Sequence, residues 1–211
     1  MEAHEPVLLK DFINLATPIT GCWVDCTFGA GGYSRALLQN GASQVLAIDK
    51  DSETKVFLKS IQNEYGNLIK FYNQSFADME TNDDITNRDD IGGIVLDLGV
   101  SSMHLDNSSR GFSFRKNGPL DMRMGNQPGP TASEIVNLCS EATLADLIFF
   151  YGQERKARKI ANRIVEERKK KEINTTFELA EIIRAIVPKN FKKDPSTRTF
   201  QAIRIAVNNE L

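Results

Sequence analysis

The chain of 211 residues has few cysteines, few histidines and no long apolar run. The three cysteines, Cys22, Cys26 and Cys139, follow no C-x-x-C spacing, so we expect neither a disulfide framework nor a zinc site. The two histidines, His4 and His104, lie far apart, and we expect no metal. No apolar stretch approaches the roughly 20 residues that span a bilayer, so no membrane partner is expected. The acidic N-terminus does not resemble a secretory signal, which favours a cytoplasmic protein.

Composition predicts a globular chain, with 41% hydrophobic and 26% charged residues. The net charge of −2 conceals an asymmetry between its halves. Residues 1–102 carry 7 Lys and Arg against 15 Asp and Glu, whereas residues 103–211 carry 19 against 13. A basic half suits a polyanionic partner, and nucleic acid is the first candidate. No residue pattern indicates an oligomeric state.

The most informative feature is a glycine cluster that follows an apolar run, VDCTFGAGGYS at residues 24–34. Its glycines, Gly29, Gly31 and Gly32, allow the backbone to pass close to a ligand. A second apolar run ends at Asp49, 20 residues after Gly29, where a parallel strand brings a carboxylate to a ribose diol. The pattern is typical of a nucleotide-type cofactor site. An ordinary glycine turn between a strand and a helix is the alternative.

Two residues around this loop indicate which cofactor it takes. A dinucleotide site has a third glycine in its G-x-G-x-x-G pattern, and this chain has Ser34 there. Asp25, just before the loop, would repel a pyrophosphate but suits a cationic ligand. S-adenosylmethionine carries an ammonium and a sulfonium group. It is therefore favoured over NAD, and a nicotinamide-dependent oxidoreductase stays as the alternative.

The hydrophobic pattern predicts an α/β fold with a doubly wound, mainly parallel sheet. Strands are expected at about 22–27, 45–49, 69–72 and 93–98, and helices at about 33–40 and 52–64. Residues 78–90 are expected to form a polar connector. Further helices are expected at 131–138, 141–150, 153–171 and 176–187, with Thr131 and Thr176 as N-caps.

A long loop at residues 109–124, SRGFSFRKNGPLDMRM, is rich in glycine, arginine and aromatic residues. Loops of this length are usually functional or disordered. Enzymes that act on RNA hold an unstacked base on aromatic faces with arginine nearby. The expected RNA contacts in this loop are Arg110, Phe112, Phe114, Arg115 and Arg123. Core packing is the alternative for each phenylalanine.

The helix expected at 153–171 has nine Lys and Arg against three acidic residues. Its apolar stripe leaves the basic side chains on the outer face, which ends in Lys169, Lys170 and Lys171. We expect these three lysines to contact RNA phosphates. A solvated surface without a partner is the alternative.

Together the motifs resemble the bacterial MraW-type family, whose S-adenosylmethionine-dependent methyltransferases modify the amino group of a cytosine in 16S ribosomal RNA. The resemblance runs nearly end to end. Its motifs here are HEPVLLKD, DCTFGAGGYS, AIDKD, LDLGVSS, RGFSFRKNGPLDMRM, YGQERKARKIANRIVEER and TRTFQAIRIAVNNEL. It implies the Rossmann-like class I methyltransferase fold with an inserted helical domain, and 16S rRNA of the small ribosomal subunit as the partner.

The resemblance also implies functional residues. The cofactor positions are Gly31, Gly32, Tyr33, Asp49, Phe76, Asp97 and His104. Three positions depart from the family pattern, which usually has His at Tyr33, Gln at His104 and Asp at Asn117.

The same resemblance implies how the chain divides into domains. Residues 1–102 and 196–211 would belong to the S-adenosylmethionine-binding domain, and residues 103–195 to an inserted, basic, substrate-recognition domain. Family members continue beyond the NEL of residues 209–211 into further strands. We therefore expect a C-terminally truncated chain that lacks the last strands and exposes a strand edge. A non-catalytic relic that binds RNA or cofactor is the second alternative.

Methyl transfer to an exocyclic amine is an in-line displacement that needs alignment and an acceptor for the amine proton. Asp97 lies at the end of the fourth expected strand, at the edge where open α/β sheets bind ligands. We expect Asp97 to be catalytic, with Ser101 and Ser102 as helpers. The alternative is that Asp97 only contacts the cofactor.

Overall fold

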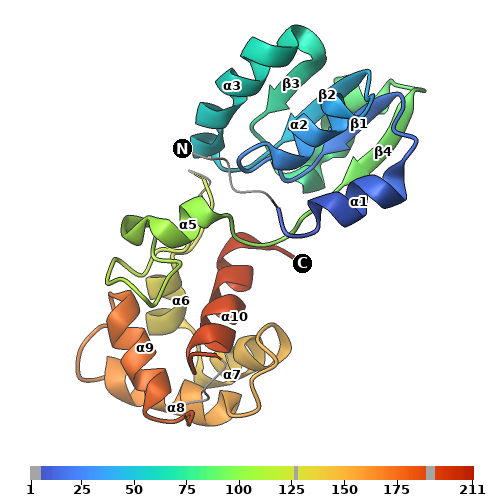
Figure 1. Cartoon of the computed structure of the whole chain (residues 1–211). Helices are drawn as coiled ribbons and strands as arrows, with labels where there is room; N and C mark the ends of the chain where they lie inside the picture. Colours follow the sequence, from blue (N-terminus) through green and yellow to red (C-terminus); the bar gives the residue numbers. More distant parts are fainter. Residues whose placement is uncertain (1–5, 126–127, 189–192) are drawn as a thin grey trace. The chain divides into compact units, whose positions relative to one another are not determined.

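The computed structural model describes residues 6–125, 128–188 and 193–211, which fall into two compact units with their sequence boundary between Ser101 and Ser102 (Figure 1). Unit 1 consists of α1 (Leu9–Ala16), β1 (Cys22–Asp25), α2 (Gly32–Gln39), β2 (Gln44–Ile48), η1 (Ser52–Thr54), α3 (Lys55–Tyr65), η2 (Gly66–Leu68), β3 (Ile69–Tyr72), η3 (Phe76–Thr81), α4 (Asp83–Thr86) and β4 (Ile91–Val95). Unit 2 consists of α5 (Ser102–Asp106), η4 (Ser108–Arg110), α6 (Ala132–Leu138), α7 (Glu141–Phe150), α8 (Ala157–Arg168), α9 (Thr176–Arg184) and α10 (Thr197–Asn208).

Unit 1 is built on a parallel sheet with the strand order β3-β2-β1-β4. The chain runs outward from β1 to β3 on one side and then crosses to β4 on the other, which is the connectivity of a doubly wound sheet. Asp25 of β1 is in register with Ala47 of β2 and Val95 of β4. The predicted fold class and all four predicted strands are confirmed.

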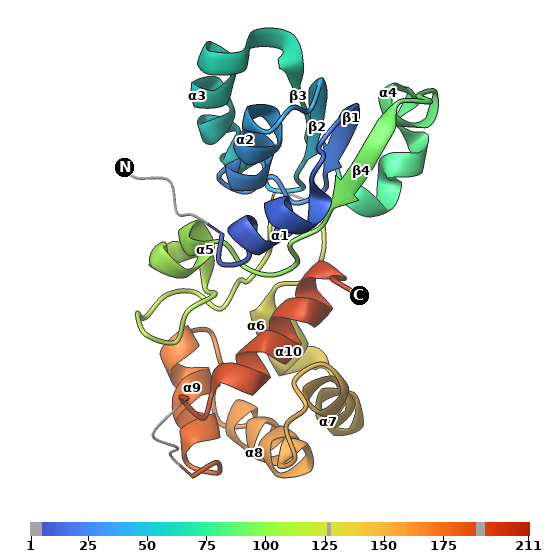
Figure 2. The same cartoon turned by 45° about the vertical axis from the view of Figure 1, so that its right-hand side comes forward.

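Helices cover the sheet on both faces. Figure 2 shows α1, α2 and α3 on one side, where their side chains join a core that includes Trp23, Val45 and Ile61. The apolar cluster on the opposite face is smaller, and apolar residues of η3 and α4 pack against it. β4 lies at one edge of the described sheet, and its Ile94 is 44% exposed.

Unit 2 is helical among its described residues, and its core lies between α6, α7, α8, α9 and α10. The predicted polar connector at 78–90 belongs to unit 1 and contains the end of η3 and the whole of α4. Residues 196–211, which the sequence assigns to the sheet domain, lie in unit 2. The reason is packing: α10 contacts α6 and α7, and its Phe200 and Ile203 are buried.

The structure corrects some predicted helix ends. Thr131 caps α6 in a capping box with Glu134, as predicted. Thr176, by contrast, is not an N-cap; it is the first, buried residue of α9, and Thr175 forms the capping box.

The helix predicted at 153–171 spans only Ala157–Arg168, and Gln153, at its predicted start, adopts a left-handed backbone with φ 52° that is not helical. The helix predicted at 176–187 ends at Arg184, four residues before Pro188, whose ring disfavours helical backbone just before it.

Candidate functional site

Three acidic residues gather at the carboxyl edge of the sheet in unit 1. Asp25 ends β1, Asp49 directly follows β2, and Asp97 lies two residues beyond β4. Because these strands are parallel and in register, their ends meet at one edge. The Asp97 N–H donates to Thr27 Oγ1 at 2.8 Å, which ties the segment after β4 to the loop after β1.

Asp25 is fully buried, and its carboxylate accepts two hydrogen bonds. The Ser34 hydroxyl donates to Oδ2 at 2.6 Å, and the Thr27 N–H donates to Oδ1 at 3.2 Å. Burial raises the pKa of Asp25 to about 6, although both hydrogen bonds lower it, and the nearby Asp49 raises it further. No charge interaction with a Lys or Arg of the described residues contributes to the pKa of Asp25, and a buried carboxylate in such surroundings suits a positively charged ligand.

Sequence reasoning treated Ser34 only as the residue that replaces a third glycine. In the structure it is the closest partner of Asp25. The signal available in the sequence was a hydroxyl placed in the first turn of the helix that follows the glycine loop.

Asp49 anchors the glycine loop to the end of β2. Its Oδ2 accepts the Gly29 N–H at 2.8 Å, and its Oδ1 accepts the Asp51 N–H at 2.8 Å. Each carboxylate oxygen can accept more than one hydrogen bond, so this anchoring is compatible with an additional contact to a hydroxyl. The spacing of 20 residues therefore does bring the acid to the loop.

The three loop glycines have different physical roles. At Gly29, with φ 51°, an added Cβ would meet only the Thr27 carbonyl oxygen at 3.8 Å. At Gly31, with φ 79°, the Cβ would lie 2.3 Å from Ile61 Cδ1. At Gly32 it would lie 2.7 Å from Pro6 Cδ. Internal packing therefore accounts for Gly31 and Gly32, whereas the Cβ position of Gly29 is open.

Tyr33 and Asp97, 64 positions apart, are brought together. Burial raises the pKa of the Tyr33 hydroxyl, and a hydrogen bond and charge interaction with Asp97 raise it further. Phe76 begins η3 after β3 and packs, half-buried, against a cluster that contains Cys26 and Ile48. All the predicted cofactor residues up to Asp97 thus belong to unit 1.

Ser101 ends unit 1, whereas Ser102 and His104 lie in α5 of unit 2. His104 is buried, and its ring centroid is 4.8 Å from that of Phe112. Arg110 lies over the same Phe112 ring at 5.9 Å. Packing inside unit 2 therefore explains the position of the Phe112 ring without an RNA base.

The other loop residues predicted to contact RNA differ in how far internal contacts restrain their side chains. Phe114 is half-buried and packs edge-on against Phe200 at 5.2 Å. Arg123 makes a bidentate ion pair with Asp121, with two N–O distances of 2.8 Å, which lowers the pKa of Asp121. Arg115 is exposed, and none of the ion pairs among the described residues involves its guanidinium.

Asn117, which replaces a usual Asp of the family, still acts as an acceptor, because the Phe177 N–H donates to its Oδ1 at 3.4 Å.

The three lysines predicted to contact phosphates are exposed but paired. The pairs are Lys169 with Glu166 at 2.8 Å, Lys170 with Glu167 at 3.1 Å, and Lys171 with Glu178 at 2.6 Å. Exposed ion pairs contribute only about 0 to 1 kcal/mol, so a phosphate can replace the glutamate. Within residues 153–171, the exposed side chains of Arg155, Arg158 and Lys159 form no ion pair with the described part of the chain.

No group of three His, Cys, Asp or Glu side chains placed to hold a metal ion occurs among residues 6–125, 128–188 and 193–211. A search of the same segments finds no helix with the length and apolar character needed to cross a membrane.

A sequence model of the MraW methylase family matches residues 1–211. The chain belongs to the MraW methylase family. It is 50% identical over 210 residues to "Ribosomal RNA small subunit methyltransferase H" of Wolbachia sp. subsp. Drosophila simulans (strain wRi), covering 99% of this chain and 72% of that protein.

Two further relatives carry the same name. The protein of Ehrlichia ruminantium (strain Welgevonden) is 49% identical over 99% of this chain and 70% of its own length. That of Cereibacter sphaeroides (strain ATCC 17025 / ATH 2.4.3) is 46% identical over 98% of this chain and 62% of its own. This member of the MraW methylase family therefore spans 62 to 72% of the length of these three relatives.

Proposed function

We propose that this chain is an S-adenosylmethionine-dependent methyltransferase that modifies the N4 amino group of a cytosine in 16S rRNA of the small ribosomal subunit. Family membership and the names of the relatives support methylation of ribosomal RNA. The observation that carries the choice of cofactor is the fully buried Asp25 beside a glycine loop that Asp49 holds in place.

The residues at the sheet edge fit this cofactor. Asp25 would hold its ammonium group, because a cation would offset the cost of burying this carboxylate, whose pKa is raised by burial. Asp49 would accept from the ribose hydroxyls, Gly29 offers an open backbone position, and Phe76 would lie near the adenine. When bound, S-adenosylmethionine would supply an electrophilic methyl group for transfer to the amine nitrogen.

Asp97 is our proposed acceptor of the amine proton. Its carboxylate is exposed, and its backbone is held by Thr27, so it can face an incoming base. The Tyr33 hydroxyl beside it orients the carboxylate. The hydroxyls of Ser101 and Ser102 would help to polarise the amine, since an in-line displacement depends on alignment more than on covalent chemistry.

RNA binding is assigned to the basic unit 2. Arg115 and the cluster of Arg155, Arg158 and Lys159 are exposed cations without an ion pair among the described residues. Such side chains bind phosphates without first breaking an internal pair. Lys169 to Lys171 remain candidates that would exchange a glutamate for a phosphate.

The test measures binding of S-adenosylhomocysteine by calorimetry and methylation of small ribosomal subunits by mass analysis of the RNA. Asp49→Ala should weaken S-adenosylhomocysteine binding at least about tenfold, because the loss of a hydrogen bond to a charged carboxylate costs more than about 1 kcal/mol. Asp84→Ala is the matched control, since Asp84 is an exposed acid of unit 1 paired with Lys70. Unchanged S-adenosylhomocysteine binding in Asp49→Ala would contradict the proposed cofactor site. A parent chain that binds S-adenosylhomocysteine and small ribosomal subunits but does not methylate the RNA would favour the non-catalytic alternative.

A further inference from the structure

The loop at residues 109–124, here named the arginine loop, contains one strained residue. Met122 is fully buried and has φ 61°, a left-handed backbone that side chains other than glycine adopt at a cost of about 1 kcal/mol or more. Its N–H donates to the Arg110 carbonyl at 3.0 Å. A conformation of this kind persists only where surrounding contacts enforce it.

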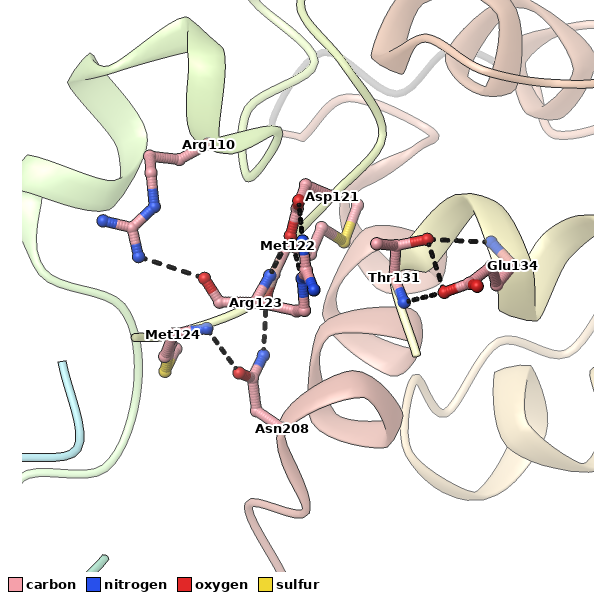
Figure 3. A network of polar contacts seen from close by, with 8 residues as sticks. All are labelled: Arg110, Asp121, Met122, Arg123, Met124, Thr131, Glu134 and Asn208. Atoms are coloured by element: carbon pink, nitrogen blue, oxygen red, sulfur yellow. Dashed lines mark hydrogen bonds and ion pairs between the residues drawn. The ribbon is translucent and has the colours of Figure 1, made fainter. Parts of the chain in front are cut away.

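Asn208, the last residue of α10, makes the contacts that enforce it. Its Nδ2 donates to the Met122 carbonyl at 2.7 Å, and its Oδ1 accepts the Met124 N–H at 2.7 Å (Figure 3). The two groups flank Arg123 on either side. One side-chain amide therefore pairs with the backbone around Arg123 as a neighbouring strand would. Nδ2 also donates to the Arg204 carbonyl at 2.9 Å, which fixes the amide on its own helix.

The backbone that Asn208 holds in turn positions two guanidinium groups. The Arg123 carbonyl accepts a hydrogen bond from Arg110 Nη2 at 3.0 Å. The Arg123 side chain reaches back to Asp121, and 40% of it remains exposed (Figure 3). A shift of the Arg123 peptide would therefore move both arginines.

We propose that Asn208 is a positioning residue for RNA binding, which holds the arginine loop so that Arg110 and Arg123 face the substrate. This inference rests on the proposed function of the chain. Asn208 itself contacts loop backbone, so its influence on RNA passes through the two arginines.

The test is Asn208→Asp in the full chain, because the carboxylate keeps the size of the amide but loses its donors. A carboxylate oxygen would face the Met122 carbonyl, so the loop should open there. The RNA dissociation constant and the KM for small ribosomal subunits should rise about tenfold, while S-adenosylhomocysteine binding stays within about twofold. Hydrogen exchange of the Met124 amide should become faster.

Asn137→Asp is the matched control. Asn137 makes the same kind of amide bracket in unit 2, with Nδ2 donating to the Ile173 carbonyl at 2.9 Å and Oδ1 accepting the Ile173 N–H at 3.0 Å. It holds the segment before α9 instead of the arginine loop. The control should lose thermal stability to a similar extent, and its RNA affinity should stay within about twofold of the parent.

Equal RNA affinity in Asn208→Asp and the parent would overturn the positioning role, and so would an equal loss in Asn137→Asp. A parent chain that binds neither S-adenosylhomocysteine nor small subunits would refute the proposed function itself. The two failures are therefore distinguishable.

Discussion

Replacing Asp25 by asparagine should stabilise the folded protein above neutral pH while weakening cofactor binding. Asp25 is fully buried, and burial raises its pKa from 3.8 to about 6. A difference of about two units corresponds to about 3 kcal/mol between the protonation states. Asparagine keeps an acceptor for the Thr27 N–H and offers a donor to the Ser34 hydroxyl.

The sign follows from proton uptake. Between about pH 4 and pH 6 the folded state keeps a proton on Asp25 that the unfolded state has released, so stability falls as pH rises through this range. Above pH 6 the whole destabilisation is present. Asp25→Asn has no carboxyl to ionise at this position and so escapes this destabilisation. Its free energy of unfolding should therefore exceed that of the parent at about pH 8 by up to about 3 kcal/mol.

Trp23 makes the measurement direct. It is the single tryptophan of the chain and lies buried on β1, two residues before Asp25. Urea unfolding followed by its fluorescence at about pH 4.5 and about pH 8 reports on unit 1. Ser34→Ala is the companion variant: it removes a hydrogen bond that lowers the pKa of Asp25, so the fall in stability should extend to higher pH. An identical pH dependence in parent and Asp25→Asn would refute this reasoning.

Three further predictions follow from the same contacts. Gly31→Ala should destabilise unit 1 by about 2 to 4 kcal/mol in urea unfolding, because the new Cβ meets Ile61 and the backbone is left-handed; a loss below about 1 kcal/mol would contradict the packing argument. Replacing Lys169 to Lys171 by glutamine should flatten the salt dependence of RNA affinity by about 0.7 per lost phosphate contact; an unchanged slope would make that segment plain surface. Glu178→Gln should remove acid sensitivity between about pH 4.5 and pH 2 in thermal unfolding, because Lys171 lowers the pKa of Glu178 to about 2 and its stabilisation is lost as pH falls through that range.

The sheet was predictable because its signals are local. Apolar runs that end in an acid or a glycine cluster mark parallel strands, and the four strands lie within a few residues of their predicted ends. The pairing of Asp49 with the Gly29 loop also followed from spacing, because register in a parallel sheet fixes which strand ends become neighbours.

Helix ends and partners in unit 2 were harder to predict, because they depend on contacts distant in sequence. Thr175 and Thr176 are equivalent as caps by residue type, and Glu178 selects Thr175 because it lies three residues further on. The roles of Phe112 and Arg123 depend on His104 and Asp121, and no periodicity reveals such pairs.

Asn208 belongs to the same class of residue. It lies 84 positions from Met124, within a helix whose pattern explains only its buried face. The motif around Asn208 resembles the one found in the family. The reason for an amide at this position becomes clear only in the structure, where the side chain contacts the arginine loop.

The charge division between the two units links cofactor choice to substrate binding. Unit 1 carries an excess of eight acidic residues, and its sheet edge collects three carboxylates, one of which is fully buried. Under the proposed function, that edge would attract a cationic methyl donor and repel a phosphate backbone. We therefore expect affinity for RNA to come from unit 2, which has an excess of six basic residues. Substitutions at Asp25 or Asp49 should thus change cofactor affinity and leave the salt dependence of RNA binding unchanged, whereas substitutions in the arginine loop should do the reverse.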